Sequence, residues 1–129
     1  MSEIDNKIYL KKKELQYRLV QVSTCEKKIK SYYSEQVSIL KEEILNLEAL
    51  KIYNLNTNES NIVDIHGATK YFVEYYLEDL IYFKSQYNIK IKLITGKGTF
   101  TLFNLVKKFL LTNKIPFKID NYCFEILLN

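Results

Sequence analysis

An aspartate and a histidine stand two residues apart in the segment Asp64-Ile65-His66-Gly67. If this segment ends a strand, both side chains lie on one face, because the side chains of an extended chain alternate. A carboxylate beside an imidazole fixes the tautomer of the ring and raises its basicity, which prepares it for general base or acid chemistry. Asp64 and His66 are therefore the candidate catalytic residues.

A second segment, Thr95-Gly96-Lys97-Gly98, has the character of an anion site. Its backbone N–H groups, followed by a helix, can hold a phosphate, and Lys97 adds a positive charge. The chain has only three glycines, all within these two segments, whereas average usage predicts about nine. Each segment alone is commonly an ordinary turn or loop. Their pairing at two strand ends favours one site, with Gly67 and Thr95 among its binding residues.

Composition bounds the class of protein. With 129 residues, 47% hydrophobic and 26% charged, the chain fits one domain, or one small domain with an appended element, and is not disordered. No apolar run approaches the ~20 residues of a membrane span, and the N-terminus lacks the features of a signal peptide. Cys25 and Cys123 lack metal-ligand spacing and are expected to pack as reduced side chains, which favours a reducing compartment, the cytosol or the nucleus. We expect a cytoplasmic protein.

The first part of the chain has the periodicity of two helices. Residues 3 to 55 contain neither glycine nor proline. Apolar residues recur at helical spacing, most clearly from Ile29 to Leu47. We predict helices over about 4–22 and 25–54, folded as an antiparallel hairpin, with Ser23 and Glu26 spaced as a capping box between them. The polar run 54–61 is typical of a linker.

The rest of the chain predicts alternating strands and helices in the order βαβαββ. The elements are a strand over 62–65, a helix over 69–87, a strand over 89–94, a helix over 101–112, and strands over 116–119 and 123–128 joined by a turn at 120–122. If the first two strands are neighbours and parallel, both glycine segments open at the same edge of the sheet. The expected domains are a helical hairpin with linker, 1–60, and an α/β domain, 61–129.

The two motifs resemble those of the Smr (small MutS-related) domain, in which a Leu-Asp-Leu-His-Gly-like motif is followed by a helix, a strand and a glycine loop. The resemblance covers about residues 61–128. More loosely, Ser34-Glu35-Gln36 and residues 49–53 resemble the helical hairpin that precedes this domain in many eukaryotic members. The resemblance implies a two-layer α/β sandwich, similar to the C-terminal domain of bacterial translation initiation factor three. It maps the catalytic pair of the family onto Asp64 and His66.

What the resemblance implies about function is binding and endonucleolytic cleavage of nucleic acid, with mRNA on stalled ribosomes as the leading substrate of eukaryotic relatives. Three departures stand out. Thr95 replaces the histidine of many bacterial members, so His66 is the only imidazole and a two-histidine mechanism is impossible. The stretch 99–102 looks shortened. Asn121-Tyr122-Cys123 places tyrosine and cysteine where relatives usually have glycine.

We therefore expect an endonuclease for single-stranded RNA, in which Gly96, Lys97 and Gly98 bind the scissile phosphate. Further lysines that could follow the nucleic-acid backbone are Lys90, Lys92, Lys107 and Lys108. The net charge of +4 is mildly basic and comes almost wholly from lysine. Exposed tyrosines stack on bases, but Tyr71, Tyr75 and Tyr82 have helical spacing and are more typical of a core.

Two other functions stay open: a non-catalytic RNA- or ribosome-binding module, and a DNA-nicking module acting in repair. No metal site is expected, because Asp64 and His66 are too few ligands, and no cofactor is implied. RNA is the preferred partner over DNA, the resemblance implies association with a ribosome, and no membrane partner is expected. The exposed stripe of the hairpin could pack on the α/β domain, dimerise or bind a partner.

Overall fold

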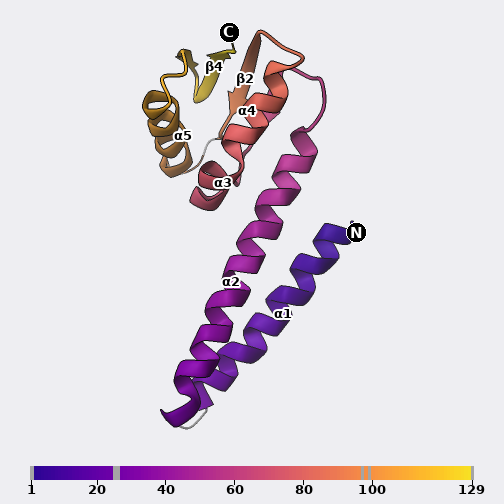
Figure 1. Cartoon of the computed structure of the whole chain (residues 1–129), viewed down its shortest axis with the longest axis vertical. Helices are drawn as coiled ribbons and strands as arrows, with labels where there is room; N and C mark the ends of the chain where they lie inside the picture. Colours follow the sequence, from indigo (N-terminus) through magenta and orange to yellow (C-terminus); the bar gives the residue numbers. More distant parts are fainter. Residues whose placement is uncertain (1, 25–26, 97, 99, 129) are drawn as a thin grey trace. The chain divides into compact units, whose positions relative to one another are not determined.

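A computed structural model describes residues 2–24, 27–96, 98 and 100–128 (Figure 1). The chain divides into two compact units, residues 1–48 and 49–129. Among the residues that the structure describes, none of the helices combines the length and apolar character needed to cross a lipid bilayer.

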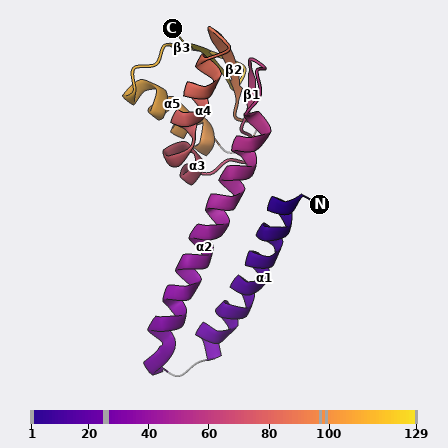
Figure 2. The ribbon, with the colours of Figure 1, turned by 45° about the vertical axis from the view of Figure 1, so that its right-hand side comes forward.

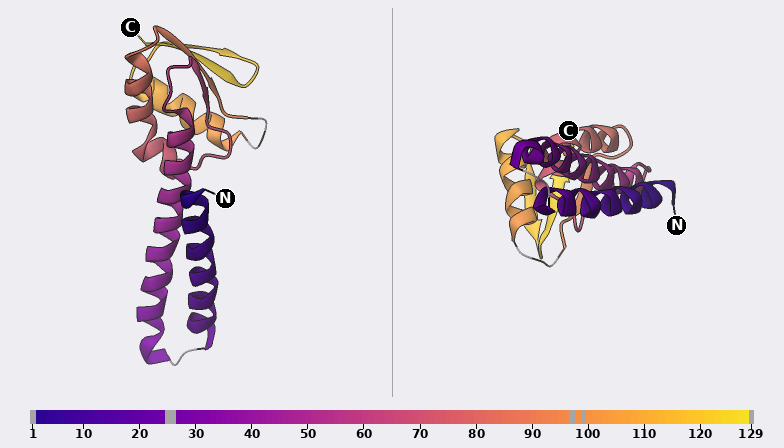
Figure 3. Two further views of the ribbon diagram at one scale, coloured as in Figure 1. Left: turned by 90° about the vertical axis from the view of Figure 1, so that its right-hand side faces the viewer. Right: turned by 90° about the horizontal axis from the view of Figure 1, so that it is seen from below.

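The first unit is a pair of antiparallel helices. Helix α1 (Glu3–Thr24) lies beside the first part of α2 (Lys27–Asn56), as Figure 3 shows. Ion pairs join Lys11 to Glu43, and Lys12 to Glu48 at 3.2 Å. The predicted stripe is buried at its centre, at Val37, Leu40 and Ile44. The helical hairpin is therefore confirmed as a structure.

The predicted capping box falls partly outside the described residues. Helix α1 continues to Thr24, two residues beyond the predicted end. Within its last turn the Ser23 hydroxyl donates to the carbonyl oxygen of Val20 at 2.9 Å. Glu26, the predicted partner of Ser23, and Cys25 lie outside the described residues.

The second unit contains a mixed four-stranded sheet in the order β1-β2-β4-β3. The strands are β1 (Ile62–Asp64), β2 (Lys90–Ile94), β3 (Phe117–Asp120) and β4 (Cys123–Leu127). Strand β1 pairs with β2 in parallel, and β4 is antiparallel to both of its neighbours, β2 and β3. The strands occur in the predicted sequence positions, but two helices instead of one connect β1 to β2, and the structure is a mixed α/β fold.

One face of the sheet carries the core. Alternate strand residues are almost completely buried, namely Val63, Ile91, Leu93, Phe124 and Ile126. They cluster with apolar residues of the helices α3 (Lys70–Tyr75), α4 (Leu77–Ser85) and α5 (Thr101–Thr112), which are labelled in Figure 2. The intervening strand residues, such as Lys90 and Lys92, are exposed. The helices thus leave the other face of the sheet open.

The single helix predicted over 69–87 is wrong, because the structure has two. Tyr76 leaves helical backbone angles, at φ −124° and ψ −26°, and separates α3 from α4. Its ring packs against Phe72, with ring centroids 6.0 Å apart, and against Tyr53 of α2 at 5.8 Å. Phe72 lies before the bend and Leu77 after it, and both are completely buried. Helical spacing in the sequence does not reveal such a bend, because both halves keep the same apolar stripe.

The expected domain boundary at residue 60 follows the linker, whereas the compact units divide inside α2, between Glu48 and Ala49. Ala49 is 2% exposed and belongs to the core of the second unit, against which Ile52 and Tyr53 also pack. The end of α2 is therefore part of the α/β unit.

A buried lysine holds the linker in place. Lys84 is completely buried, and its Nζ donates to the carbonyl oxygens of Asn58 and Ser60 at 2.9 and 2.7 Å and to Asn58 Oδ1 at 3.1 Å. These acceptors match the three protons of an ammonium group. Burial lowers the pKa of Lys84. The linker therefore has a fixed course into β1.

Candidate functional site

The two predicted motifs meet at one edge of the sheet. Asp64, the last residue of β1, is level with Ile94, the last residue of β2. The ladder continues one step further, with the N–H of Ile65 donating to the carbonyl oxygen of Ile94 at 2.9 Å. The expectation that both segments open at the same edge is confirmed.

Asp64 and His66 form a hydrogen-bonded pair. The Oδ1 atom of Asp64 lies 2.7 Å from Nδ1 of His66, and it also accepts the backbone N–H of His66 at 3.1 Å. Partial burial raises the pKa of the Asp64 carboxyl, but the bonds from the His66 side chain and backbone outweigh it, so that the pKa is lowered. Asp64 is therefore ionised at neutral pH.

The hydrogen bond to the ionised carboxylate determines which ring nitrogen of His66 carries the proton. Since a carboxylate can only accept hydrogen bonds, a contact of 2.7 Å requires a proton on Nδ1 of His66. In the neutral ring the lone pair then lies on Nε2. The His66 side chain is 73% exposed, so the ring is accessible from solvent. The geometry suits a general base that acts through Nε2.

Two glycines shape the backbone around His66. Gly67 has φ +79°, and the N–H of Ala68 donates to the carbonyl oxygen of Ile65 at 3.0 Å, which closes a tight turn with His66 inside it. Gly96 has φ +86°, and a Cβ built on it would lie 3.1 Å from Cβ of His66. Both positions favour glycine for its backbone freedom, and Gly96 also lets the second loop approach the histidine.

Asn56, in the last turn of α2, holds Asp64 from the other side. Its Nδ2 donates to the carbonyl oxygen of Asp64 at 2.9 Å, and its Oδ1 accepts the N–H of Asp64 at 3.0 Å. Asn56 is 5% exposed. Asn56 could not be predicted from the sequence, because it lies in the polar run assigned to the linker and no local signal separates it from its neighbours.

A hollow of about 540 Å³ begins at Gly67, the residue that follows His66, while Asp64 and His66 are not among the residues that line it. Gly67, Thr95 and Gly98, three of the predicted binding residues, line it together with Lys70, a cation that was not among the predicted site residues. The Thr95 hydroxyl donates to the carbonyl oxygen of Tyr122 at 3.1 Å, which ties the glycine loop to the β3–β4 turn. Lys97 lies outside the described residues.

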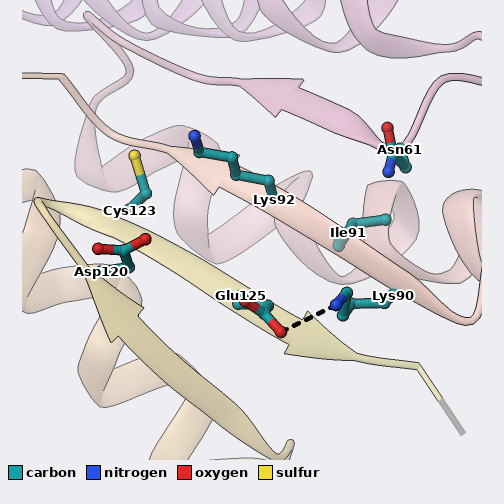
Figure 4. A pocket seen from close by; sticks show the side chains of 7 residues that line it. All are labelled: Asn61, Lys90, Ile91, Lys92, Asp120, Cys123 and Glu125. Atoms are coloured by element: carbon teal, nitrogen blue, oxygen red, sulfur yellow. Dashed lines mark ion pairs between the residues drawn. The ribbon is translucent and has the colours of Figure 1, made fainter.

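The other predicted lysines lie on two surfaces. Lys107 and Lys108 are exposed on α5, and Lys108 lines a different hollow, of about 220 Å³, together with Lys70. Lys90 and Lys92 lie on the open face of the sheet, where a hollow of about 290 Å³ also has Cys123 and Glu125 in its wall (Figure 4). Lys90 forms an ion pair with Glu125 at 3.1 Å.

The tyrosines assigned to a core differ among themselves. Tyr71 is partly buried and packs against the core, whereas Tyr75 and Tyr82 are 62% and 68% exposed. The core assignment is therefore wrong for Tyr75 and Tyr82. Their positions on α3 and α4 point away from the sheet, because Val73 and Leu80 occupy the buried faces of these helices.

The fold and the site together define a mixed α/β domain with an Asp–His pair where two parallel strands end. Comparison of the chain with protein-family models, with curated proteins and with solved structures found no match. Within the described part of the chain, no three His, Cys, Asp or Glu side chains come together in a way that could hold a metal ion.

Proposed function

We propose that this protein is an endonuclease that binds and cleaves single-stranded RNA, with His66 as general base and Asp64 as the residue that orients it. The observation that carries the proposal is the 2.7 Å hydrogen bond between Asp64 and His66 at the common end of β1 and β2. The resemblance of both motifs to the Smr domain supports the same reaction. It also favours RNA over DNA and mRNA quality control on ribosomes as the cytoplasmic setting.

In the proposed reaction, Nε2 of His66 removes a proton from the attacking oxygen, which is the neighbouring 2′-hydroxyl or a water molecule. That oxygen forms a bond to phosphorus, and the bond between phosphorus and the 5′-oxygen breaks. Attacking and leaving oxygens lie roughly in line on opposite sides of phosphorus, so one ring cannot serve both. Because His66 is the only histidine, the leaving 5′-oxygen takes its proton from solvent.

The phosphate is proposed to lie in the hollow beside His66. Gly67, Gly98 and Lys70 line this hollow, and Gly96 brings its loop to within contact distance of His66. Backbone N–H groups of Gly96 and Gly98, with the amine of Lys97, would stabilise the charge that develops on the phosphate oxygens. Lys107 and Lys108 on α5 would contact neighbouring phosphates as point charges. Lys90, which is paired with Glu125 at the start of β2, and Lys92 lie on the open face of the sheet and are not assigned to this contact.

Incubation of the full chain with end-labelled single-stranded RNA, single-stranded DNA and duplex DNA tests the proposal. RNA is expected to be cut, and His66→Ala, purified identically, is expected to cut it roughly 100- to 10,000-fold more slowly, the usual contribution of a general base. A 2′-deoxy residue at the cut position blocks cleavage if the 2′-hydroxyl attacks and leaves it unchanged if water attacks. Cleavage is expected to persist in EDTA, because the described site offers only two possible metal ligands.

The nuclease activity, the assigned site and the RNA substrate are each contradicted by a different result. RNA that is bound but stays intact would replace the nuclease with the alternative of an RNA- or ribosome-binding module, which a single imidazole suits equally well. Cutting by His66→Ala at the parental rate would refute the site while leaving an activity to explain. Nicking of duplex DNA with intact RNA would favour the repair module.

A further inference from the structure

Two aromatic rings lie exposed side by side next to the candidate site. Phe100 precedes α5, and Tyr122 lies in the turn between β3 and β4. Their ring centroids are 5.7 Å apart, with 37° between the ring planes. Phe100 is 57% exposed and Tyr122 is 44% exposed. The two adjacent rings therefore form an apolar patch on the surface. Because both rings are largely exposed, their burial contributes little to the stability of the fold.

The rings are tied to the loop that contacts His66. The carbonyl oxygen of Tyr122 accepts the hydroxyl of Thr95 at 3.1 Å. The next residue, Gly96, approaches Cβ of His66. Across the sheet, Cys123 is level with Ile94, and Ile94 with Asp64. Two strand spacings, about 10 Å, therefore separate Asp64 from the residue that follows Tyr122.

The backbone of Tyr122 is in an unfavourable conformation for a tyrosine. Its φ is +66°, and that of Asn121 is +47°. Positive φ at both central residues is the pattern of a tight hairpin turn, in which asparagine is common at the first position and glycine at the second. A bulky residue with positive φ is strained, and such strain is concentrated at functional sites. Burial of the Tyr122 ring does not compensate this backbone strain, because the ring is exposed.

The rings of Phe100 and Tyr122 are connected to the core by further aromatic contacts. Phe100 meets Phe103 edge-on, with ring centroids 6.4 Å apart. Phe103 in turn stacks on Phe124 at 4.7 Å, and Phe124 is completely buried. A continuous series of rings thus connects the exposed pair to the core, so a ligand would meet a preformed surface.

We propose that Phe100 and Tyr122 form a stacking subsite for an unpaired base of the nucleic acid whose phosphate lies at His66. The inference rests on the proposed function and gives a structural reason for its preference for single strands. The faces of bases in a duplex are covered by their neighbours, whereas an unpaired base offers a free face to an aromatic ring. Stacking tolerates any base, since every base has a π-face.

Binding of a short fluorescein-labelled oligouridylate to the full chain, followed by anisotropy at fixed salt, tests the subsite. Tyr122→Gly removes the ring and relieves the positive φ, so the folded state is expected to stay at least as stable. The affinity is expected to fall roughly 5- to 100-fold, as for loss of one base–aromatic stack, and Phe100→Ala is expected to act likewise. Tyr122→Phe is expected to retain binding.

Tyr82→Ala is the control, since Tyr82 is also an exposed tyrosine, at 68% against 44% for Tyr122. It lines a hollow with Leu127, which pairs with Lys90 at the start of β2, at the opposite end of the strands from His66. It is expected to leave the affinity unchanged. An oligouridylate with an abasic position at the stacked nucleotide is expected to bind more weakly to the parent chain, but as well as the intact oligouridylate to Tyr122→Gly.

The outcomes separate this inference from the proposed function. If RNA is bound and cut but Tyr122→Gly and Phe100→Ala bind it like the parent, the stacking subsite is refuted and the nuclease stands. If both variants weaken binding to a duplex as much as binding to the single strand, the rings do not recognise unpaired bases. If the parent chain binds no single strand at all, the proposed function fails and the subsite fails with it.

Discussion

The side-chain amide of Asn56 binds both backbone groups of Asp64: it donates to the carbonyl oxygen at 2.9 Å and accepts the N–H at 3.0 Å. Strand β1 lies at the edge of the sheet, with β2 as its one neighbour among the described strands. Asn61 and Ile65 bond to β2, and alternate residues of a strand direct their backbone groups to opposite sides. Asn56 thus takes the place of a further strand at Asp64.

Replacing Asn56 with alanine leaves the two backbone groups of Asp64 without their partners. Loss of these bonds at a buried position is expected to destabilise the fold by about 2–3 kcal/mol. Hydrogen exchange gives a sharper readout: the Asp64 amide is expected to exchange much faster, while the Ile65 amide, which bonds to Ile94, keeps its protection. Asn113→Ala, which removes one exposed bond to Phe109, is the control. Unchanged protection of Asp64 would show that Asn56 does not hold it.

The three glycines form a graded series. Gly67→Ala introduces strain at φ +79° in open space, Gly96→Ala adds a contact of 3.1 Å with His66 to strain at φ +86°, and Gly98→Ala meets nothing within 4 Å. Thermal unfolding is expected to show a loss of about 1–2 kcal/mol for Gly67→Ala, a larger loss for Gly96→Ala, and little change for Gly98→Ala. An equal loss of stability for Gly67→Ala and Gly96→Ala would show that the loop at Gly96 shifts to accommodate the new methyl group without displacing His66.

Substitution of the buried Lys84 is expected to release the linker. Lys84→Met preserves much of the volume but leaves the oxygens of Asn58 and Ser60 without a donor. The expected loss is about 2–4 kcal/mol, measured by chemical unfolding. Lys118→Met, at an exposed position on β3, is expected to change the free energy of unfolding by no more than about 0.5 kcal/mol. Similar results for both variants would make the Lys84 bonds energetically unimportant.

The lowered pKa of Lys84 gives the same residue a pH signature. Burial brings its folded-state pKa below the ordinary value of 10.5. Between these two values the unfolded chain binds a proton that the native chain does not, so stability rises with pH in this interval. The free-energy difference between the parent and Lys84→Met is therefore expected to grow as pH approaches 10.5. A difference that stays constant over alkaline pH would contradict this prediction.

Asp64 is expected to show a pH dependence of the same sign, but in an acidic window. Its folded-state pKa lies below the ordinary value of 3.8, since the bonds from His66 outweigh partial burial. The stability that it contributes is therefore fully present above 3.8 and is lost as pH falls through the folded-state pKa. An NMR titration of the Asp64 carboxyl carbon measures this directly. Comparison with Asp64→Asn should show a stability difference that is constant above pH 3.8 and shrinks below it; a midpoint above 3.8 would contradict the hydrogen-bond assignment.

Much of the candidate site follows from local sequence. Asp64 and His66 are two residues apart, so their hydrogen bond needs only an extended backbone and a turn at Gly67. The helical periodicity of the first 55 residues, and the alternation of strands and helices that follows, likewise depend on neighbours in the chain. That is why the order of the strands could be predicted, together with the meeting of both glycine loops at one edge on the condition that the first two strands are parallel neighbours.

Other features depended on which distant segments the fold brings together. Asn56 reaches Asp64 because the end of α2 packs on the core of the second unit, and Lys84 reaches the linker across 26 residues of chain. The bend at Tyr76 and the contact of Phe100 with Tyr122 depend on packing between separate elements in the same way. The sequence by itself determined the helical hairpin, the order of the strands and the Asp64–His66 pair, because these follow from backbone propensity and local spacing. Only the tertiary structure decided what supports that pair and which rings lie beside it, because hydrogen bonds and ring contacts between distant residues leave no periodic trace in the sequence.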